Sequence, residues 1–157
     1  MPVDDIVHAQ DELASHRYAF FLHPTYWLKC ACDDIASWQM VKLSQAGKDY
    51  VPSEPGIYTL LVQPGIVCHP ACSYLMYVGK TTTLKRRFRE YLHEAQRETG
   101  RPKIMRLITK YPDHTWFCFR IVSAENLERV EDALIAAYLP PANDKFPAEV
   151  RPAIGAF

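Results

Sequence analysis

The 157 residues, of which 48% are hydrophobic and 23% charged, are enough for one compact soluble domain and few for two. The 18 basic residues balance the 18 acidic ones, which excludes a uniformly basic nucleic-acid coat and an acidic disordered tail. The balance hides a local patch, because residues 80–110 carry ten Lys or Arg and three Glu, a net charge of +7, which leaves −7 elsewhere. We therefore expect a bipolar molecule with one face suited to polyanions. The alternative is that these cations are only the solvated face of a helix.

The longest segment without a charged side chain is not a membrane span. It covers residues 55–79, and Pro64, Gly65 and Pro70 interrupt it where a lipid-facing helix would need continuous hydrogen bonding. The N-terminus carries acids where a secretory signal has basic residues. We expect a cytoplasmic protein without membrane contact.

An odd number of cysteines, five, agrees with a reducing compartment in which thiols serve as metal ligands or as buried apolar groups. Four of them fall in two close pairs, Cys30 with Cys32 and Cys68 with Cys72, that could bring four thiolates to one structural Zn²⁺. The alternative is that they are small buried hydrophobic side chains.

The N-terminal third is expected to be helical. Apolar spacing predicts an amphipathic helix over residues 1–15 and a second over residues 33–45, the latter with Ile35, Trp38, Val41 and Leu43 facing inward. Prolines at 52 and 55 mark the expected boundary. We predict an N-terminal helical extension, residues 1–51, that packs on a domain over residues 52–157.

The remaining elements follow in chain order from residue 56. Apolar runs over residues 56–62 and 73–79 predict two strands of a long-looped hairpin. Helical spacing returns over residues 83–97 and 101–110, a third strand is expected over 114–122, and a last helix over 125–138 ends at two prolines.

The last helix contains a carboxylate on its apolar side. At about 100° per residue, its apolar stripe consists of Leu127, Val130, Leu134, Ile135 and Tyr138. Glu131 falls inside this stripe, whereas Glu128 and Asp132 point toward solvent. An ionised carboxylate facing a core is costly unless it is paired or binds a metal, so Glu131 is a site candidate. The alternative is a structural pair with a buried arginine.

One arginine of the helix at residues 83–97 differs from its neighbours. Arg87 lies at the edge of the apolar stripe, one turn before Tyr91, so both side chains can reach the same cleft. A guanidinium there can bind a phosphate with two hydrogen bonds. The alternative is that its stem is buried and its head remains in water.

Five motifs, taken together, resemble those of the GIY-YIG endonuclease superfamily. They are Pro-Gly-Ile-Tyr at 55–58, Tyr-Val-Gly-Lys-Thr at 77–81, Leu-Lys-Arg-Arg at 84–87, Glu-Asp-Ala-Leu-Ile at 131–135, and the Pro140 to Asn143 segment. The resemblance covers roughly residues 52 to 145 and includes the glutamate already singled out by its burial.

The resemblance implies an α+β fold, a small three-stranded antiparallel sheet flanked by helices, with the N-terminal helical extension added to it. It implies a divalent-metal-dependent endonuclease that hydrolyses DNA phosphodiester bonds. In this family the side chains expected to converge on one cleft are those of Tyr58, Tyr77, Arg87, Glu131 and Asn143.

By the same resemblance, Glu131 would hold one Mg²⁺ or Mn²⁺ and Arg87 would stabilise charge on the phosphate. Tyr77 is assigned as general base, with Lys80 or a metal-bound water favouring its ionised form. Tyr58 would orient water or phosphate, and the roles of the two tyrosines could be exchanged. Asn143 would order the cleft by hydrogen bonds, and Tyr91 stands where relatives carry Tyr or His.

DNA is the expected partner, with RNA as the alternative. The basic side chains expected to contact it are Lys85, Arg86, Arg89, Lys103 and Arg106. Because no separate DNA-reading module is recognised in the sequence, specificity is expected to come from the loop over residues 63–73, from the N-terminal extension, from a homodimer or from a protein partner. Two other functions remain open on the same fold: a non-catalytic nucleic-acid-binding module and a zinc-containing interaction module.

Overall fold

The computed structural model describes residues 3–30, 37–65, 72–97 and 99–154. Four strands form one sheet: β1 (Gln39–Lys42), β2 (Gly56–Val62), β3 (Tyr74–Thr81) and β4 (Thr115–Ile121). The strand order is β1-β4-β2-β3, and every neighbouring pair is antiparallel. β2 and β3 thus form the predicted hairpin, and the order leaves β3 at one edge of the sheet.

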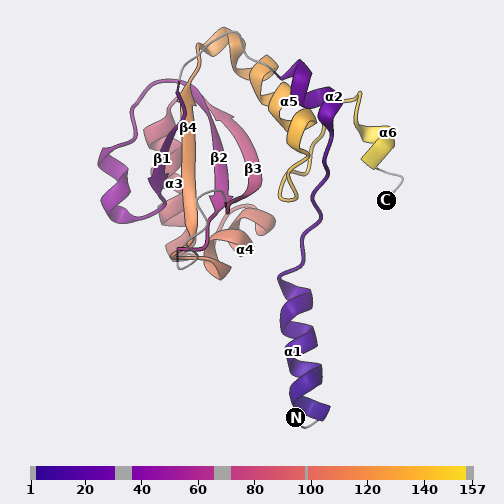
Figure 1. Ribbon diagram of the computed structural model, residues 1–157. Coiled ribbons are helices and arrows are strands. Elements are labelled where there is room, and N and C mark those ends of the chain that lie inside the picture. Colours follow the sequence, from indigo (N-terminus) through magenta and orange to yellow (C-terminus); the bar gives the residue numbers. More distant parts are fainter. Residues whose placement is uncertain (1–2, 31–36, 66–71, 98, 155–157) are drawn as a thin grey trace.

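The predicted fold class, an antiparallel sheet flanked by helices, is confirmed. α3 (Leu84–Arg97) and α4 (Pro102–Lys110) cover one face of the sheet, and α5 (Leu127–Tyr138) covers the other (Figure 1). Two short 3-10 helices, η1 (Gln45–Asp49) and η2 (Ala124–Asn126), and the C-terminal α6 (Arg151–Ile154) complete the described elements. The sheet has one strand more than predicted.

The additional strand corrects the expected helix over residues 33–45. Residues 39–42 pair with β4 instead, with Val41 opposite Phe117, and η1 follows. The free edge of β4 offers a row of backbone hydrogen bonds, which outweighs the weak helical spacing of a short segment. Of the four side chains predicted to face inward, Leu43 is buried and Val41 partly so, Trp38 is 39% exposed, and Ile35 lies outside the described residues.

The core is divided by the sheet. On the face toward α3 and α4, Tyr58, Leu60 and Tyr77 pack with Phe88 and Phe117. On the other face, the side chains in contact are those of Ile57, Val78, Leu127, Val130 and Leu134. Successive residues of β2 alternate between the two clusters, as the two-residue period of a strand requires.

The stripe predicted for α5 is correct over its first two turns and wrong at its end. Leu127, Val130, Leu134 and Ile135 are buried, but Tyr138 is 44% exposed, and Ala136 and Ala137 are buried in its place. The reason is a second neighbour that the spacing could not predict. α2 (Pro24–Lys29) packs on α5, and the indole nitrogen of Trp27 donates to the Ala137 carbonyl at 2.8 Å.

The helix predicted at the N-terminus is present as α1 (Val3–Ser15), and it projects away from the rest of the molecule (Figure 1). None of its described residues is buried. Its contacts with the domain are made at its last residue, Ser15, whose carbonyl accepts hydrogen bonds from Lys110 at 2.7 Å and Arg106 at 3.1 Å. Among the described residues, no helix is both long and apolar enough to cross a membrane.

Candidate active site

The residues predicted to act together lie on the two faces of the edge strand β3. Tyr77 belongs to the cluster under α3 and α4, whereas Val78 belongs to the cluster under α5. Lys80 shares the α5 side with Val78, since the two are two residues apart on one strand, and it is ion-paired to Glu131 of α5. The candidate site is therefore built around β3 from both sides.

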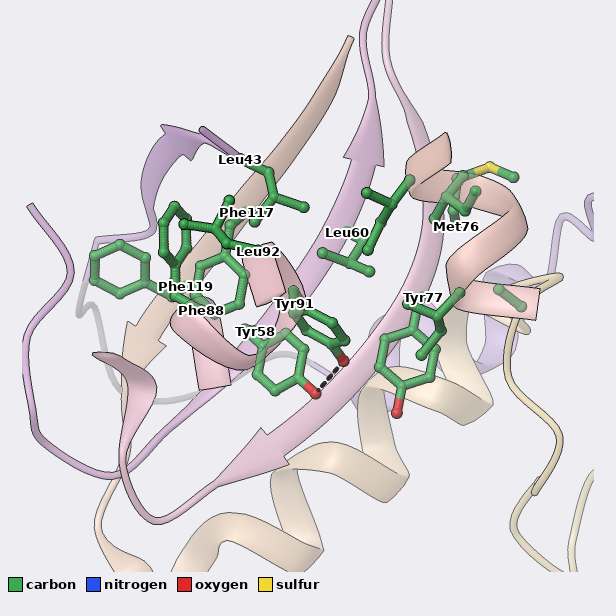
Figure 2. Close-up of a cluster of buried hydrophobic side chains, with 14 of the residues drawn as sticks. Leu43, Tyr58, Leu60, Met76, Tyr77, Phe88, Tyr91, Leu92, Phe117 and Phe119 are labelled. Atoms are coloured by element: carbon green, nitrogen blue, oxygen red, sulfur yellow. Dashed lines mark hydrogen bonds between the residues drawn. The ribbon is translucent and has the colours of Figure 1, made fainter. Parts of the chain in front are cut away.

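On the α3 side, three tyrosines and an arginine form a hydrogen-bonded cluster. The hydroxyls of Tyr58 and Tyr91 are 2.8 Å apart, and the Tyr77 ring lies beside the Tyr58 ring at 6.1 Å between centroids (Figure 2). Arg101 donates through Nη1 to the Tyr77 oxygen at 2.6 Å and through Nη2 to the Tyr91 oxygen at 3.3 Å. One guanidinium thus links two phenols that come from a strand and a helix.

The close approach of these rings depends on the absence of a side chain at residue 79. A Cβ there would lie 2.5 Å from the Tyr58 oxygen and 2.8 Å from Cε1 of Tyr77. Gly79 stands opposite Tyr58 in the β2–β3 register, so its hydrogen atom leaves the space that the phenol occupies. The glycine of the Tyr-Val-Gly motif has a packing function here.

Burial decides the protonation of two of the three tyrosines. It raises the pKa of Tyr58 well above its ordinary value, and it raises the pKa of Tyr91 to about 12. Both phenols therefore retain their protons at neutral pH. They can donate hydrogen bonds and orient neighbouring groups, but they are poorly suited to accept a proton from water.

Arg87 lies next to this cluster on α3. Its guanidinium carbon is 5.9 Å from the centroid of the Tyr91 ring, and its Nη1 is 2.8 Å from the carboxylate of Glu90, which Arg86 also approaches at 3.6 Å. Its Nε is buried and has no hydrogen-bond partner among the described residues. A buried donor without an acceptor is costly, so this nitrogen is an unsatisfied polar group beside the tyrosine cluster.

On the α5 side, Glu131 forms the predicted half-buried carboxylate. Its side chain is 17% exposed and lies 2.9 Å from the Lys80 ammonium, whereas Glu128, 82% exposed, is 4.0 Å from the same nitrogen. The hydrogen bond to Glu131 raises the pKa of Lys80. Within the described ranges, no group of three or more His, Cys, Asp or Glu side chains is arranged to hold a metal.

Asn143 is buried, and its side chain is fully engaged with the backbone of β3. Its Oδ1 accepts from the Val78 N–H and its Nδ2 donates to the Val78 carbonyl, both at 2.9 Å. The preceding residue, Ala142, donates from its backbone to Met76 at 2.9 Å. This segment pairs the outer edge of β3 and holds the strand that carries Tyr77 and Lys80.

The basic residues predicted to contact nucleic acid do not form one set. Arg86 and Arg89 are exposed on α3 and Lys85 is partly exposed there. On α4, Lys103 is 2.7 Å from Asp144, and Arg106 donates to the carbonyl of Ser15. Part of the basic window therefore serves internal contacts.

The predicted zinc ligands are only partly described. Cys30 packs against the cluster under α5, and Cys72 is partly exposed. Cys32 and Cys68 lie outside the described residues, so the zinc site stays a prediction.

Sequence reasoning did not single out two residues of this site. Arg101 stands among ten cations in the basic window, and no spacing distinguishes it, because its partner Tyr77 is 24 residues away. Glu90 could have been found, since it follows Arg86 by four and Arg87 by three residues on one helix, the spacing of helical ion pairs.

No protein-family model and no curated protein matches the chain. Solved structures similar to it are point-mutant forms of the GIY-YIG N-terminal endonuclease domain of UvrC from Thermotoga maritima, each bound to its catalytic divalent cation. Two are 23% identical, with 60% of this chain and 88% of that domain covered and a TM-score of 0.43. A third is 24% identical, with 59% and 86% covered and a TM-score of 0.42. These domains belong to the superfamily that the five sequence motifs resemble.

Proposed function

We propose that this protein is a divalent-metal-dependent endonuclease that hydrolyses DNA phosphodiester bonds. The observation that carries the proposal is the arrangement around β3, with a half-buried carboxylate paired to a lysine on one face and two arginines beside a phenol cluster on the other. Hydrolysis of a phosphodiester needs a metal ligand, donors for the phosphate oxygens and a proton acceptor. The five motifs that resemble the GIY-YIG superfamily include Tyr58, Tyr77, Lys80, Arg87 and Glu131 of this arrangement.

Glu131 is the residue proposed to hold Mg²⁺ or Mn²⁺. One carboxylate suits Mg²⁺, which dehydrates reluctantly and keeps several water ligands. When bound, the cation neutralises charge on the scissile phosphate and its leaving oxygen. Lys80, 2.9 Å away, orients the carboxylate.

Tyr77 is the proposed proton acceptor for the attacking water. Arginine only donates, so Arg101 occupies a lone pair of the Tyr77 oxygen and would stabilise the phenolate. Burial keeps Tyr58 and Tyr91 protonated, which favours Tyr77 over Tyr58 for this role. Arg101 thereby takes the part that was expected of Lys80.

Arg87 is proposed to bind the non-bridging oxygens of the phosphate, where negative charge builds up in the transition state. Glu90 pairs with its Nη1 at 2.8 Å, and a guanidinium has five N–H donors, so further donors of Arg87 remain for the phosphate oxygens. Glu90 thus orients the guanidinium.

The first test is cleavage of supercoiled and branched DNA with Mg²⁺ or Mn²⁺. Glu131→Gln and Arg87→Ala should each lower kcat about a hundredfold or more while binding is retained. Glu128→Gln is the matched control for Glu131→Gln, because Glu128 is an exposed carboxylate on the same helix, and this variant should cut like the wild type.

Two outcomes would contradict the proposal. Wild-type protein that binds DNA in a salt-dependent way but cuts no substrate would indicate the non-catalytic binding module instead. Equal activity of the Glu131→Gln and Glu128→Gln variants would show that Glu131 does not hold the metal. RNA substrates included in the same assay distinguish the alternative nucleic acid.

Arg101 is tested through the separate effects of its substitution on kcat and KM. Arg101→Ala should lower kcat with little change in KM, because the proposed proton acceptor Tyr77 loses its hydrogen-bond donor. Arg101→Lys should restore part of the rate. A lowered melting temperature in Arg101→Ala, with no recovery of the rate in Arg101→Lys, would show that this residue only holds the fold.

A further inference from the structure

A second candidate site lies away from the tyrosine cluster, between the segment that follows α1 and the edge of the sheet. A cavity of ≈ 690 Å³ opens there, within the size range of ligand sites. Its walls come from residues 16–20, from β3 through Tyr74 and Met76, and from Tyr111 and His114 around the end of α4. None of the proposed catalytic residues lines it.

The wall contributed by the N-terminal segment is held in place by specific contacts. The Ser15 carbonyl accepts from Lys110 at 2.7 Å, and His16 Nδ1 is hydrogen-bonded to the hydroxyl of Tyr111 at 2.7 Å. The rings of His16 and Tyr111 also meet edge to face, with centroids 5.5 Å apart. The cavity therefore has a defined shape in the absence of a ligand.

The mouth of the cavity presents aromatic rings to solvent. Phe20 is 44% exposed and Tyr74 is 47% exposed, with their centroids 5.8 Å apart and their planes at 40°. Exposed aromatic side chains on separate segments, gathered at one opening, favour a planar apolar ligand that stacks on them.

The charges around the cavity select the kind of planar ligand. Among the described residues that line it, Arg17 is the one Lys or Arg, and there is no Asp or Glu. The surroundings thus attract an anion, and the rings attract a flat heterocycle. A nucleotide combines both properties.

We propose that this cavity binds an unpaired nucleobase of the nucleic-acid substrate, with Arg17 near its phosphate. The inference rests on the proposed nuclease function. It specifies a substrate with a single-stranded or unpaired stretch, because a stacked, paired base could not enter the cavity.

The position of the cavity fits one continuous substrate. Met76, which lines it, is followed on β3 by Tyr77 of the tyrosine cluster (Figure 2). α4 connects the two places, with Arg101 directly before it and Tyr111 directly after it. Nine helical residues span about 13 Å, so the bound base would lie a few nucleotides from the scissile phosphate.

The test measures binding without metal, so that no cleavage occurs. A labelled short oligothymidylate and a blunt duplex of the same length are titrated with the full chain in EDTA, and fluorescence anisotropy gives the two Kd values. The wild type should prefer the single strand. Tyr74→Ala and Phe20→Ala should each weaken single-strand binding about tenfold, while Tyr74→Phe keeps the ring and should bind like the wild type.

Tyr50→Ala is the control variant, because Tyr50 is 74% exposed and does not line the cavity. Single-strand affinity unchanged in both Tyr74→Ala and Phe20→Ala, with melting temperatures equal to the wild type, would overturn the inference, as would equal affinity for duplex and single strand. Binding with the expected pattern but no cleavage on adding Mg²⁺ would leave the cavity assigned and refute the nuclease. Cleavage by the wild type, together with single-strand binding that is unaltered in both alanine variants, would support the nuclease and refute the assignment of the cavity.

Discussion

At residue 79, the space that a methyl group would need is filled by the Tyr58 phenol. Gly79→Ala should displace that ring from Tyr91 and Tyr77, lower the free energy of unfolding by about 1–3 kcal/mol and reduce cleavage. Urea unfolding measures the first effect. Gly65→Ala is the control, because among the described residues its Cβ would approach nothing closer than His114 at 3.9 Å. Equal effects of the two substitutions would contradict the packing role of Gly79.

Tyr91 should make the protein sensitive to alkali. An exposed phenol in the unfolded chain loses its proton near pH 10, whereas in the folded protein burial raises the pKa of Tyr91 to about 12. The contribution of Tyr91 to the free energy of unfolding is fully present below pH 10. Between pH 10 and 12 the unfolded state releases the proton first, so the free energy of unfolding falls as pH rises, by about 2–3 kcal/mol in total.

Tyr91→Phe should remove the share of that slope that comes from Tyr91, since phenylalanine has no proton to lose, and Tyr58, whose pKa burial also raises, should keep the rest. Urea unfolding across the same pH interval measures the difference. Tyr50→Phe, at a position that is 74% exposed, should leave the slope unchanged. If the free energy of unfolding falls with pH as steeply in Tyr91→Phe as in the wild type, other groups cause the alkaline decline.

β3 is an edge strand, and the Asn143 side chain makes two hydrogen bonds to its outer edge, both to the backbone of Val78. Asn143→Ala removes both hydrogen bonds to Val78 and leaves its N–H and carbonyl without these partners, which should cost about 2–4 kcal/mol. Faster amide exchange at Val78 would locate the effect on the strand. Asn126→Ala, at a partly exposed position whose side-chain amide donates to the Ser123 hydroxyl, should cost well under 1 kcal/mol. Similar losses in both variants would rule out the special role of Asn143.

The packing of the chain as a whole predicts how it responds to shortening. Deletion of residues 1–14 removes all of α1 except Ser15, and because no described residue of α1 is buried, the free energy of unfolding should change by less than about 0.5 kcal/mol. Deletion of residues 1–29 also removes α2 and the bond from Trp27 to α5, and should be clearly destabilising. If the two deletions destabilise equally, α1 packs on the domain in solution, as the predicted extension over residues 1–51 would require.

Charge is also distributed at the level of the whole molecule. The window of residues 80–110 is strongly basic, but Arg106 and Lys110 bind the carbonyl end of α1 and Lys103 pairs with Asp144. The exposed cations of α3 are therefore the part of the window best placed for phosphates. Counting charges along the chain identifies the window, but not which of its members are engaged internally.

The sequence alone determined the elements whose patterns are local and strong. β2 was predicted with its observed bounds, and the helices over 83–97 and 101–110 differ from α3 and α4 by one residue at their first position. Helical spacing placed Glu131 inside the apolar stripe and Glu128 toward solvent, and their side chains are 17% and 82% exposed. Such features depend on side chains within a few turns of one another, where periodicity is informative.

The tertiary structure decided what depends on distant partners. β1 is a strand because β4 has a free edge, Tyr138 is exposed because α2 covers a different side of α5, and Arg101 reaches Tyr77 across 24 residues of chain. The strand period predicts that Tyr77 and Lys80 face opposite ways, but only the packing of helices on both faces shows which partner each meets. Long-range contacts supply free energies that outweigh local preference, and they leave no periodic pattern in the sequence.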